Sequence, residues 1–440
     1  RSSVFPQYVS ACFVILKTGC YYFKLLKQND SERHKRGKHK AYMGCDKQLL
    51  KNIDIERAVE MLCALPVMLD TETVGLADAH GRVFAEDVRA AMMSPPFDRS
   101  PFDGYAFRGE DTAGASREHP VTLRITEEIP AGKAAEVEIL PGYAAKILTG
   151  APIPKGANAT VKYENTEFTP TEVKLFEPVG ANTDVIYAGD DIKAGARIAE
   201  KGTVITASHQ GILAGQGISE VVVYRKPVIK ILNTGSELLE VGTPLRPAMI
   251  YNSNVYTLSG YLKDMGAEPH NAGIAVDDPD VIAAGISAAL RSSDMVITTG
   301  GASVGDYDWA VTSASILGAD ILFWKINMKP GGSMMAAVKD GKMILGLSGN
   351  PGAAVLGLFR IARPYIRKLC GRTDLNPYAI DVFLKEPLKK SSPKRRLLRG
   401  RLEYSGGKAY FAENEGQGNG TVYSLLGCDL LGEIEAGSPP

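Results

Sequence analysis

The chain has 440 residues, with 50 basic and 50 acidic side chains and no net charge at neutral pH. This length is about three times the roughly 150 residues of a typical domain, so several domains with separate cores are expected. The balanced charge excludes bulk attraction to nucleic acid or an acidic membrane, and no apolar run reaches the 18 or so residues that cross a bilayer.

The six cysteines, at positions 12, 20, 45, 63, 370 and 428, form no CxxC pair. Their spacing predicts neither a zinc ribbon nor a disulfide framework. A reducing, cytoplasmic compartment fits this pattern.

The first 42 residues combine an apolar patch at 8–26 with a basic cluster at 33–40. One interpretation is a membrane or targeting segment, because basic residues beside an apolar stretch can hold an anionic surface. The other, which we favour, is a non-native or disordered leader, with Met43 as the true first residue. Deletion of residues 1–42 is then expected to leave folding and activity unchanged.

Helical spacing of apolar residues predicts a helix at 54–65, and residues 76–88 resemble a helix followed by a strand. Residues 94–225 are typical of β structure, because short apolar runs alternate there with Gly and Pro turns. Strands are expected at 121–125, 144–148 and 173–176.

After residue 227, strands at 228–232, up to 276, and at 295–298 alternate with helices at 253–265, 279–291 and 351–369. This alternation predicts a mostly parallel sheet covered by helices on both faces. Such sheets bind ligands at the carboxyl ends of their strands. From about residue 379 the pattern returns to β with Gly-rich turns.

Acidic residues follow three of these strands, and they are Glu237, Asp277 with Asp278, and Asp306 with Asp308. Their loops meet at one edge of a parallel sheet, where Mg²⁺ could be held by carboxylates together with substrate phosphates. The alternative is that Asp278 caps a helix and the others are solvated loop charges.

The run from Thr298 to Gly305 leaves a strand and is rich in glycine. Small residues there let backbone N–H groups approach a phosphate. Lys325 and Lys329, just before Pro330, could face the same pocket as clamps for an oxyanion, or could be ordinary surface lysines.

Residues 95–106 resemble the signature PxFDxSxMDGYA of the molybdopterin molybdenumtransferases, the MoeA family, which includes the E domain of gephyrin. Further segments resemble this family in the same order, at residues 147–154, 189–192, 234–238, 300–308, 325–331 and 349–351. The resemblance runs from about Ile53 to the C-terminus.

The resemblance implies a multi-domain protein of α/β plus β class, whose α/β/α sandwich domain is similar to the molybdopterin adenylyltransferases. Besides the leader at 1–42, the expected domains are an elongated N-terminal domain (43–94 with 196–227), an inserted β-rich domain (95–195), an α/β molybdopterin-binding domain (228–374) and a small C-terminal β-domain (375–440).

The implied reaction is Mg²⁺-dependent insertion of molybdate into adenylylated molybdopterin, with release of AMP. Cations and backbone amides would neutralise and hold the phosphates of the substrate. The resemblance also implies a homodimer, with a cleft between the α/β domain of one subunit and the β-rich domain of the other. A molybdopterin adenylyltransferase is a candidate partner.

Carried over to this sequence, the resemblance makes Glu237, Asp277 and Asp308 the Mg²⁺-associated acidic set, and it makes Lys325 and Lys329 ligand-holding bases. We expect these five residues to be catalytic. The expected substrate-binding residues are Asp103, Thr149, Asp191, Thr234, Gly300, Gly301, Ser303, Asn350 and Arg399.

Four positions depart from the family pattern. Gly332 stands where the second lysine of Lys-Pro-Gly-Lys-Pro is common, and Ile186 stands where an arginine is usual. Ser348 and Asn252 replace a Pro and an Asp. If the lost cations are simple drift, Ile186→Arg and Gly332→Lys are each expected to strengthen ligand binding by about 1 kcal/mol or more.

Two alternatives stay open. One is a molybdopterin adenylyltransferase acting with ATP, which the long β-rich segments argue against, and the other is a non-catalytic pterin-binding or scaffold protein that retains the fold. Molybdate-dependent AMP release would distinguish the three. If Asp308 holds Mg²⁺, Asp308→Asn is expected to weaken both metal dependence and turnover while the fold survives.

Overall fold

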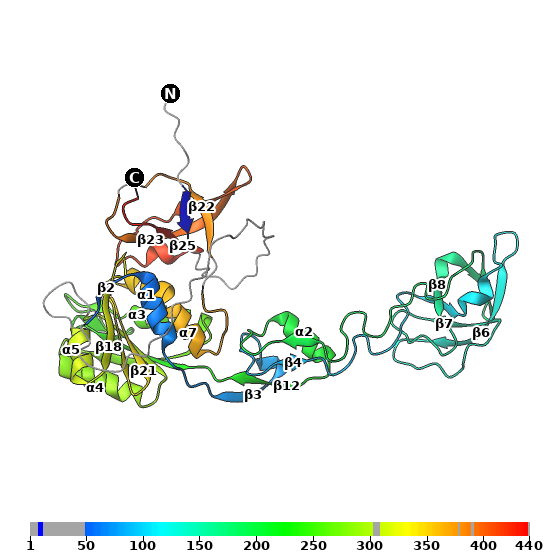
Figure 1. Ribbon diagram of the computed structural model, residues 1–440, viewed down its shortest axis with the longest axis horizontal. Helices are drawn as coiled ribbons and strands as arrows, with labels where there is room; N and C mark the ends of the chain where they lie inside the picture. The colour runs from blue at the N-terminus through cyan, green and yellow to red at the C-terminus, as the bar shows by residue number, and fades with distance from the viewer. Residues whose placement is uncertain (1–7, 12–48, 302–308, 377–378, 389–390, 439–440) are drawn as a thin grey trace, which may run out of the picture.

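The computed structural model describes residues 8–11, 49–301, 309–376, 379–388 and 391–438. The molecule is elongated (Figure 1), with the α/β domain and the C-terminal β-domain at one end and the β-rich domain at the other. A slender segment joins the two ends. In the described part of the chain, no helix has both the length and the apolar character needed to cross a membrane.

A seven-stranded sheet forms the centre of the α/β domain, in the order β16-β13-β17-β21-β20-β18-β2. Within this sheet only β20 runs antiparallel to its neighbours, so the predicted mostly parallel sheet is confirmed. The strands are β2 (Lys51–Ile53), β13 (Val228–Thr234), β16 (Glu268–Ala275), β17 (Met295–Thr299), β18 (Asp320–Ile326), β20 (Met335–Lys339) and β21 (Lys342–Leu347).

Helices cover both faces of this sheet. Met295 and Ile297 of β17 face one layer and Val296 faces the other, as the two-residue period of a strand requires. The first layer contains α1 (Ile55–Ala64), α3 (Asn254–Asp264), α6 (Pro351–Gly357), the π-helical turn η4 (Leu358–Ala362) and α7 (Arg363–Leu369). The second contains α4 (Pro279–Leu290) and α5 (Trp309–Ile316).

The helix ends follow local sequence signals. The carboxylate of Asp278 accepts hydrogen bonds from the backbone N–H groups of Asp280 and Val281, which caps α4 where the sequence predicted it. The predicted helix at 351–369 is present but is interrupted by the π-helical turn. The expected helix near residue 76 is wrong, since only a 3₁₀ turn, η1 (Leu76–Asp78), forms there.

The slender segment consists of two passes of the chain. β3 (Thr71–Gly75) pairs antiparallel with β12 (Glu220–Tyr224), and β4 (Val88–Arg89) pairs with β11 (Arg197–Ala199). The helix α2 (Ala207–Gly215), which the sequence analysis missed, packs Leu213 into a small core beside Phe84. Residues from both sides of the inserted domain therefore share this core.

The β-rich domain is a six-stranded sheet in the order β8-β5-β7-β6-β10-β9. The expected strands at 121–125, 144–148 and 173–176 are confirmed as β6 (Val121–Ile129), β7 (Tyr143–Ile147) and β10 (Glu172–Leu175). The other elements are β5 (Gly104–Phe107), β8 (Ala159–Lys162), β9 (Thr166–Phe168) and the 3₁₀ turns η2 (Gly109–Thr112) and η3 (Tyr163–Asn165). Gly104 has no room for a side chain, because a Cβ there would lie 1.9 Å from the carbonyl oxygen of Val161.

The C-terminal sheet has the order β1-β22-β24-β23-β19, and β25 pairs with β23. Its strands are β1 (Tyr8–Ala11), β19 (Met328–Lys329), β22 (Ile380–Leu384), β23 (Arg395–Ser405), β24 (Lys408–Glu413) and β25 (Leu430–Ile434). The 3₁₀ turn η5 (Tyr423–Leu425) precedes β25, and the short pair β14 (Leu238–Leu239) and β15 (Ile250–Tyr251) lies in the α/β domain.

The strand β1 corrects one expectation. The sequence analysis left residues 1–42 outside the folded domains, whereas Tyr8–Ala11 pairs antiparallel with β22. The edge of β22 presents backbone N–H and C=O groups, and a short extended segment can satisfy them without a long apolar pattern of its own. That is why the periodicity of the sequence gave no sign of this pairing.

Candidate active-site cavity

A cavity of about 960 Å³ opens at the carboxyl ends of β13, β17 and β21, where Thr234, Thr299 and Ser348 line it. Residues of the C-terminal domain line it from the other side. It brings together eight of the residues expected from the sequence: Thr234, Glu237, Asp277, Gly300, Gly301, Lys325, Lys329 and Asn350.

The glycine turn after β17 can be built only from residues without a side chain. Gly300 has φ +94°, and a Cβ there would lie 2.3 Å from the carbonyl oxygen of Thr234. Gly301 also has a positive φ, of +65°. Backbone groups in this turn are therefore uncovered by side chains, as close approach to a phosphate requires.

Hydrogen bonds beneath the turn hold it in position. The Thr299 hydroxyl donates to Oδ1 of Asn233 (2.7 Å), and the Thr234 hydroxyl donates to the carbonyl oxygen of Thr299 (3.2 Å). All three residues are buried. The sequence analysis missed Asn233, although an amide inside an otherwise apolar strand is a usable signal of such a network.

The acidic side of the cavity is formed by Glu237 and Asp277, which lie on the loops after β13 and β16. Both residues are exposed. The carboxylate of Asp277 accepts a hydrogen bond from the backbone N–H of Ser236 (3.1 Å), which ties the two loops together.

Asp306, Asp308 and Ser303 lie outside the described residues. Across the ranges that the structure describes, there is no group of three or more His, Cys, Asp or Glu side chains that could hold a metal. The carboxylates of Glu237 and Asp277 nevertheless fit Mg²⁺, because this ion is commonly bound by one or two carboxylates together with waters and substrate phosphates.

The basic side of the cavity is formed by Lys325, near the end of β18, and Lys329, just after this strand. Lys325 has φ +66°, which is uncommon for a residue with a side chain, and its Nζ lies 4.3 Å from the centre of the Trp324 ring. Lys329 is exposed and also lines the cavity. Both lysines therefore border the same space as the two carboxylates.

The surroundings of Gly332 argue against the expected gain from Gly332→Lys. A Cβ at this position would lie 2.5 Å from the carbonyl oxygens of both Ile326 and Met328. The loop folds so tightly that the carbonyl oxygen of Gly332 accepts a hydrogen bond from the backbone N–H of Ile326 (2.8 Å). Gly332→Lys would consequently disturb the lysine-bearing loop before it could add a cation.

Arg399 occupies a different position from the one expected of a substrate ligand. It is fully buried, and its guanidinium donates to the carbonyl oxygens of Gly418 (3.0 Å) and Thr421 (2.9 Å). It does not line the cavity, but it holds the loop that presents Asn419 and Gly420 to it. Its contacts are those of a residue that positions this wall.

Asp103 and Thr149 meet in the β-rich domain. The carboxylate of Asp103 accepts hydrogen bonds from the backbone N–H and the hydroxyl of Thr149, both at 2.7 Å. These bonds lower the pKa of Asp103 from its usual value. The pair is remote from the cavity within one chain, because β5 and β7 belong to the far end of the molecule (Figure 1).

Asp191 lies where the chain leaves the β-rich domain, and the Ser94 hydroxyl donates to its carboxylate at 3.4 Å. Ile186 is in backbone register with Arg99, to which it is joined by two hydrogen bonds. Arg99, a cationic residue, therefore lies opposite position 186 on the neighbouring segment.

Comparison with known proteins agrees with this architecture. Residues 53–217 match the MoeA N-terminal region (domain I and II), and residues 230–368 match a probable molybdopterin binding domain. The chain thus joins a MoeA-type N-terminal region to an α/β domain of the molybdopterin-binding type.

Two relatives, both named molybdopterin molybdenumtransferase, match most of the chain. The protein of Bacillus subtilis (strain 168) is 36% identical over 360 residues, which cover 81% of this chain and 84% of the relative. That of Staphylococcus aureus (strain Mu50) is 32% identical over 384 residues, which cover 87% and 91%. The chain belongs to the molybdopterin molybdenumtransferase family, as its motifs suggested.

The fold is also similar to that of a solved MoeA structure. The crystal structure of the molybdopterin biosynthesis MoeA protein from Pyrococcus horikoshii OT3 aligns with a TM-score of 0.75 at 29% sequence identity, over 88% of this chain and 96% of that one. The expected class, α/β plus β over several domains, is confirmed.

Proposed function

We propose that this protein inserts molybdate into adenylylated molybdopterin and releases AMP. The observation that carries the proposal is the cavity itself, which combines a side-chain-free glycine turn, Lys325 and Lys329 with the carboxylates of Glu237 and Asp277. An adenylylated pterin carries a pyrophosphate, whose oxygens backbone amides and lysines can bind, while the carboxylates can hold Mg²⁺ against it. Family membership supports the same reaction.

Each group has a separate role in this proposal. The ammonium groups of Lys325 and Lys329 and the amides around Gly300 hold the pyrophosphate, so that the bond to AMP is oriented for cleavage. Glu237 and Asp277 would hold Mg²⁺, which when bound supplies charge neutralisation at the phosphate oxygens. Asn233 and Thr299 keep the glycine turn in place through their hydrogen bond.

The reaction is tested by incubating the purified protein with adenylylated molybdopterin and Mg²⁺, with and without molybdate, and measuring AMP. AMP release that requires molybdate is the expected result. Consumption of ATP with release of pyrophosphate would instead support an adenylyltransferase. Tight binding of the pterin with no turnover under any condition would support a scaffold protein.

We also propose that the protein acts as a homodimer. Asp103 and Thr149 match functional positions of the family, yet they adjoin β5 and β7 of the β-rich domain, which lies at the other end of the molecule from the α/β domain (Figure 1). A second chain could bring its β-rich domain to the cavity of the first. Light scattering during size-exclusion chromatography should then give twice the mass of the chain, and a monomer mass would contradict the proposal.

The cellular setting follows from the same reaction. We expect a cytoplasmic protein that receives its adenylylated substrate from a molybdopterin adenylyltransferase. Three described cysteines, Cys63, Cys370 and Cys428, are free thiols, which supports a reducing compartment. Co-purification with the adenylyltransferase of the same cell would test the partner.

A further inference from the structure

The C-terminal domain contributes a wall to the cavity that neither family model covers, since the second match ends at residue 368. Ser392, Pro393 and Lys394 line the cavity just before β23, and Asn419 and Gly420 line it from the loop held by Arg399. Among the described residues of this wall, Lys394 is the basic one. Its side chain is exposed.

The start of β23 is hydrogen-bonded directly to the lysine-bearing loop. β19 pairs with β23 in parallel, so that Met328 lies opposite Arg395 and Lys329 opposite Arg396. Side chains alternate along a strand, and Met328 is buried while Lys329 is exposed at the cavity. Lys394 lies in the bend immediately before β23 and lines the same cavity as Lys329.

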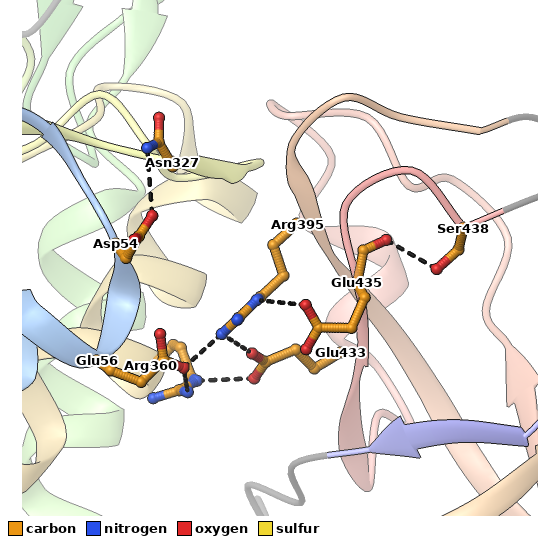
Figure 2. Close-up of polar contacts among 8 residues, drawn as sticks. All are labelled: Asp54, Glu56, Asn327, Arg360, Arg395, Glu433, Glu435 and Ser438. Atoms are coloured by element: carbon orange, nitrogen blue, oxygen red, sulfur yellow. Dashed lines mark hydrogen bonds and ion pairs between the residues drawn. The ribbon is translucent and has the colours of Figure 1, made fainter.

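Arg395 anchors this segment through ion pairs (Figure 2). Its guanidinium pairs with the carboxylates of Glu56 and Glu433, and Glu433 also pairs with Arg360 at 2.9 Å. Glu433 is only 5% exposed. These contacts join α1 and η4 of the α/β domain to β23 and β25, which fixes the backbone next to Lys394.

Among the described residues, the ion pairs of this segment use Arg395 and leave Lys394 without an acidic partner. An anchored backbone thus carries a lysine that lines the same cavity as Lys329 and has no ion pair with a described acidic residue. Position 332 cannot provide such a group, because it has no room for a side chain.

We propose that Lys394 is a third cationic ligand-binding residue, which the C-terminal domain adds to Lys325 and Lys329. It contacts phosphate oxygens of the bound substrate, and for the identity of that substrate the assignment rests on the proposed function. The C-terminal domain is then part of the binding site, and its packing against the α/β domain determines the position of the Lys394 ammonium group.

The test uses inorganic pyrophosphate as a probe, titrated calorimetrically into the full-length protein. Lys394→Gln should weaken pyrophosphate binding about five- to tenfold, as expected for loss of one partly exposed charge-assisted contact. Lys394→Arg should stay within about twofold of the wild type, because it keeps the charge. The matched control is Lys408→Gln, since Lys408 is an exposed lysine of the same domain whose Nζ lies over the Phe383 ring.

Molybdate-dependent AMP release gives a second readout. Lys394→Gln should raise KM for adenylylated molybdopterin by a similar factor and change kcat by less than about twofold, because the contact already exists in the bound substrate. Wild-type pyrophosphate affinity in Lys394→Gln, or no pyrophosphate binding by the wild type, would overturn the assignment. If Lys394→Gln weakens pyrophosphate binding but neither the wild type nor any variant releases AMP, Lys394 remains a ligand-binding residue and the proposed reaction is rejected.

Discussion

Two adjacent carboxylates, Asp277 and Asp278, have different surroundings and therefore different expected roles. Asp277 lines the cavity, whereas the carboxylate of Asp278 accepts hydrogen bonds from backbone N–H groups in the first turn of α4. The sequence already suggested this division, because Asp278 stands directly before Pro279 as a candidate cap and the family resemblance selects Asp277. The hydrogen bonds of the cap make the distinction.

Asp277→Asn should raise the Mg²⁺ concentration needed for half-maximal AMP release and lower turnover, with little change in melting temperature. Asp278→Ala should leave the Mg²⁺ response and turnover unchanged. It should lower the free energy of unfolding by about 1 kcal/mol, because the cap of α4 is lost. Mg²⁺ titration and thermal unfolding of both variants check this. Identical Mg²⁺ responses in Asp277→Asn and the wild type would reject the proposed metal site.

Asp103 illustrates a pH effect at the scale of one residue. Its pKa is lowered by the backbone N–H and the hydroxyl of Thr149. A lowered folded-state pKa means that the contribution of this pair is fully present above the unfolded value, near about 3.9, and is lost as pH falls through the folded value. At neutral pH the pair is unaffected.

Thr149→Val removes the hydroxyl donor but keeps the backbone donor. The pKa of Asp103 should therefore rise part of the way towards its usual value, which a carboxyl NMR titration can follow. Thr126→Val is a suitable control, because the Thr126 hydroxyl donates instead to the carbonyl oxygen of Ala144. An unchanged Asp103 titration in Thr149→Val would show that the hydroxyl bond contributes nothing in solution.

At the scale of elements, the tight loop between β19 and β20 determines how the lysines are presented. Gly332→Ala should displace the carbonyls of Ile326 and Met328 and destabilise the protein by roughly 1–3 kcal/mol. KM for the pterin should rise as Lys329 moves. Gly341→Ala is a contrasting control, since its Cβ would meet nothing within 4 Å and only its positive φ is strained. Tighter pterin binding by Gly332→Lys would contradict this account.

Sequence patterns predicted the elements whose signals are local. α1, α3 and α4 were found from apolar spacing and caps, and the parallel sheet from its alternation with helices. The missed α2 has its cap in Thr206, but its weak amphipathic pattern gave no further sign.

The features that the sequence could not supply depend on contacts between distant segments. The pairing of β1 with β22 and of β19 with β23 joins parts of the chain more than sixty residues apart. The burial of Arg399 and the absence of space at Gly332 depend on packing in the same way. Motifs thus identified residues of the cavity, while the fold decided which of them reach it.

At the scale of the whole molecule, the ion cluster of Figure 2 links charged side chains of the α/β domain to those of the C-terminal domain. Glu433→Gln would leave Arg360 and Arg395 facing each other without a shared, buried carboxylate. The expected loss is roughly 2–4 kcal/mol, because the two guanidinium groups then keep only the exposed carboxylates of Glu56 and Glu435 as partners. Glu403→Gln is a control, since Glu403 forms exposed ion pairs within the C-terminal domain.

Thermal unfolding and hydrogen exchange measure the effect. Exchange in Glu433→Gln should increase first in β23 and β25, on the side that faces α1. Equal melting temperatures of the two variants would show that the cluster does not hold the domains together.

The elongated shape has a consequence for inheritance. If every working site combines the Asp103 end of one chain with the cavity of another, chains that are defective at opposite ends can repair each other. Co-expression of Asp103→Ala with Lys325→Ala should restore about a quarter of the normal sites, because half of randomly formed dimers are mixed and each mixed dimer has one intact site. Neither variant should be active alone. A complete absence of rescue in a strain carrying both genes would mean that each chain builds its site by itself.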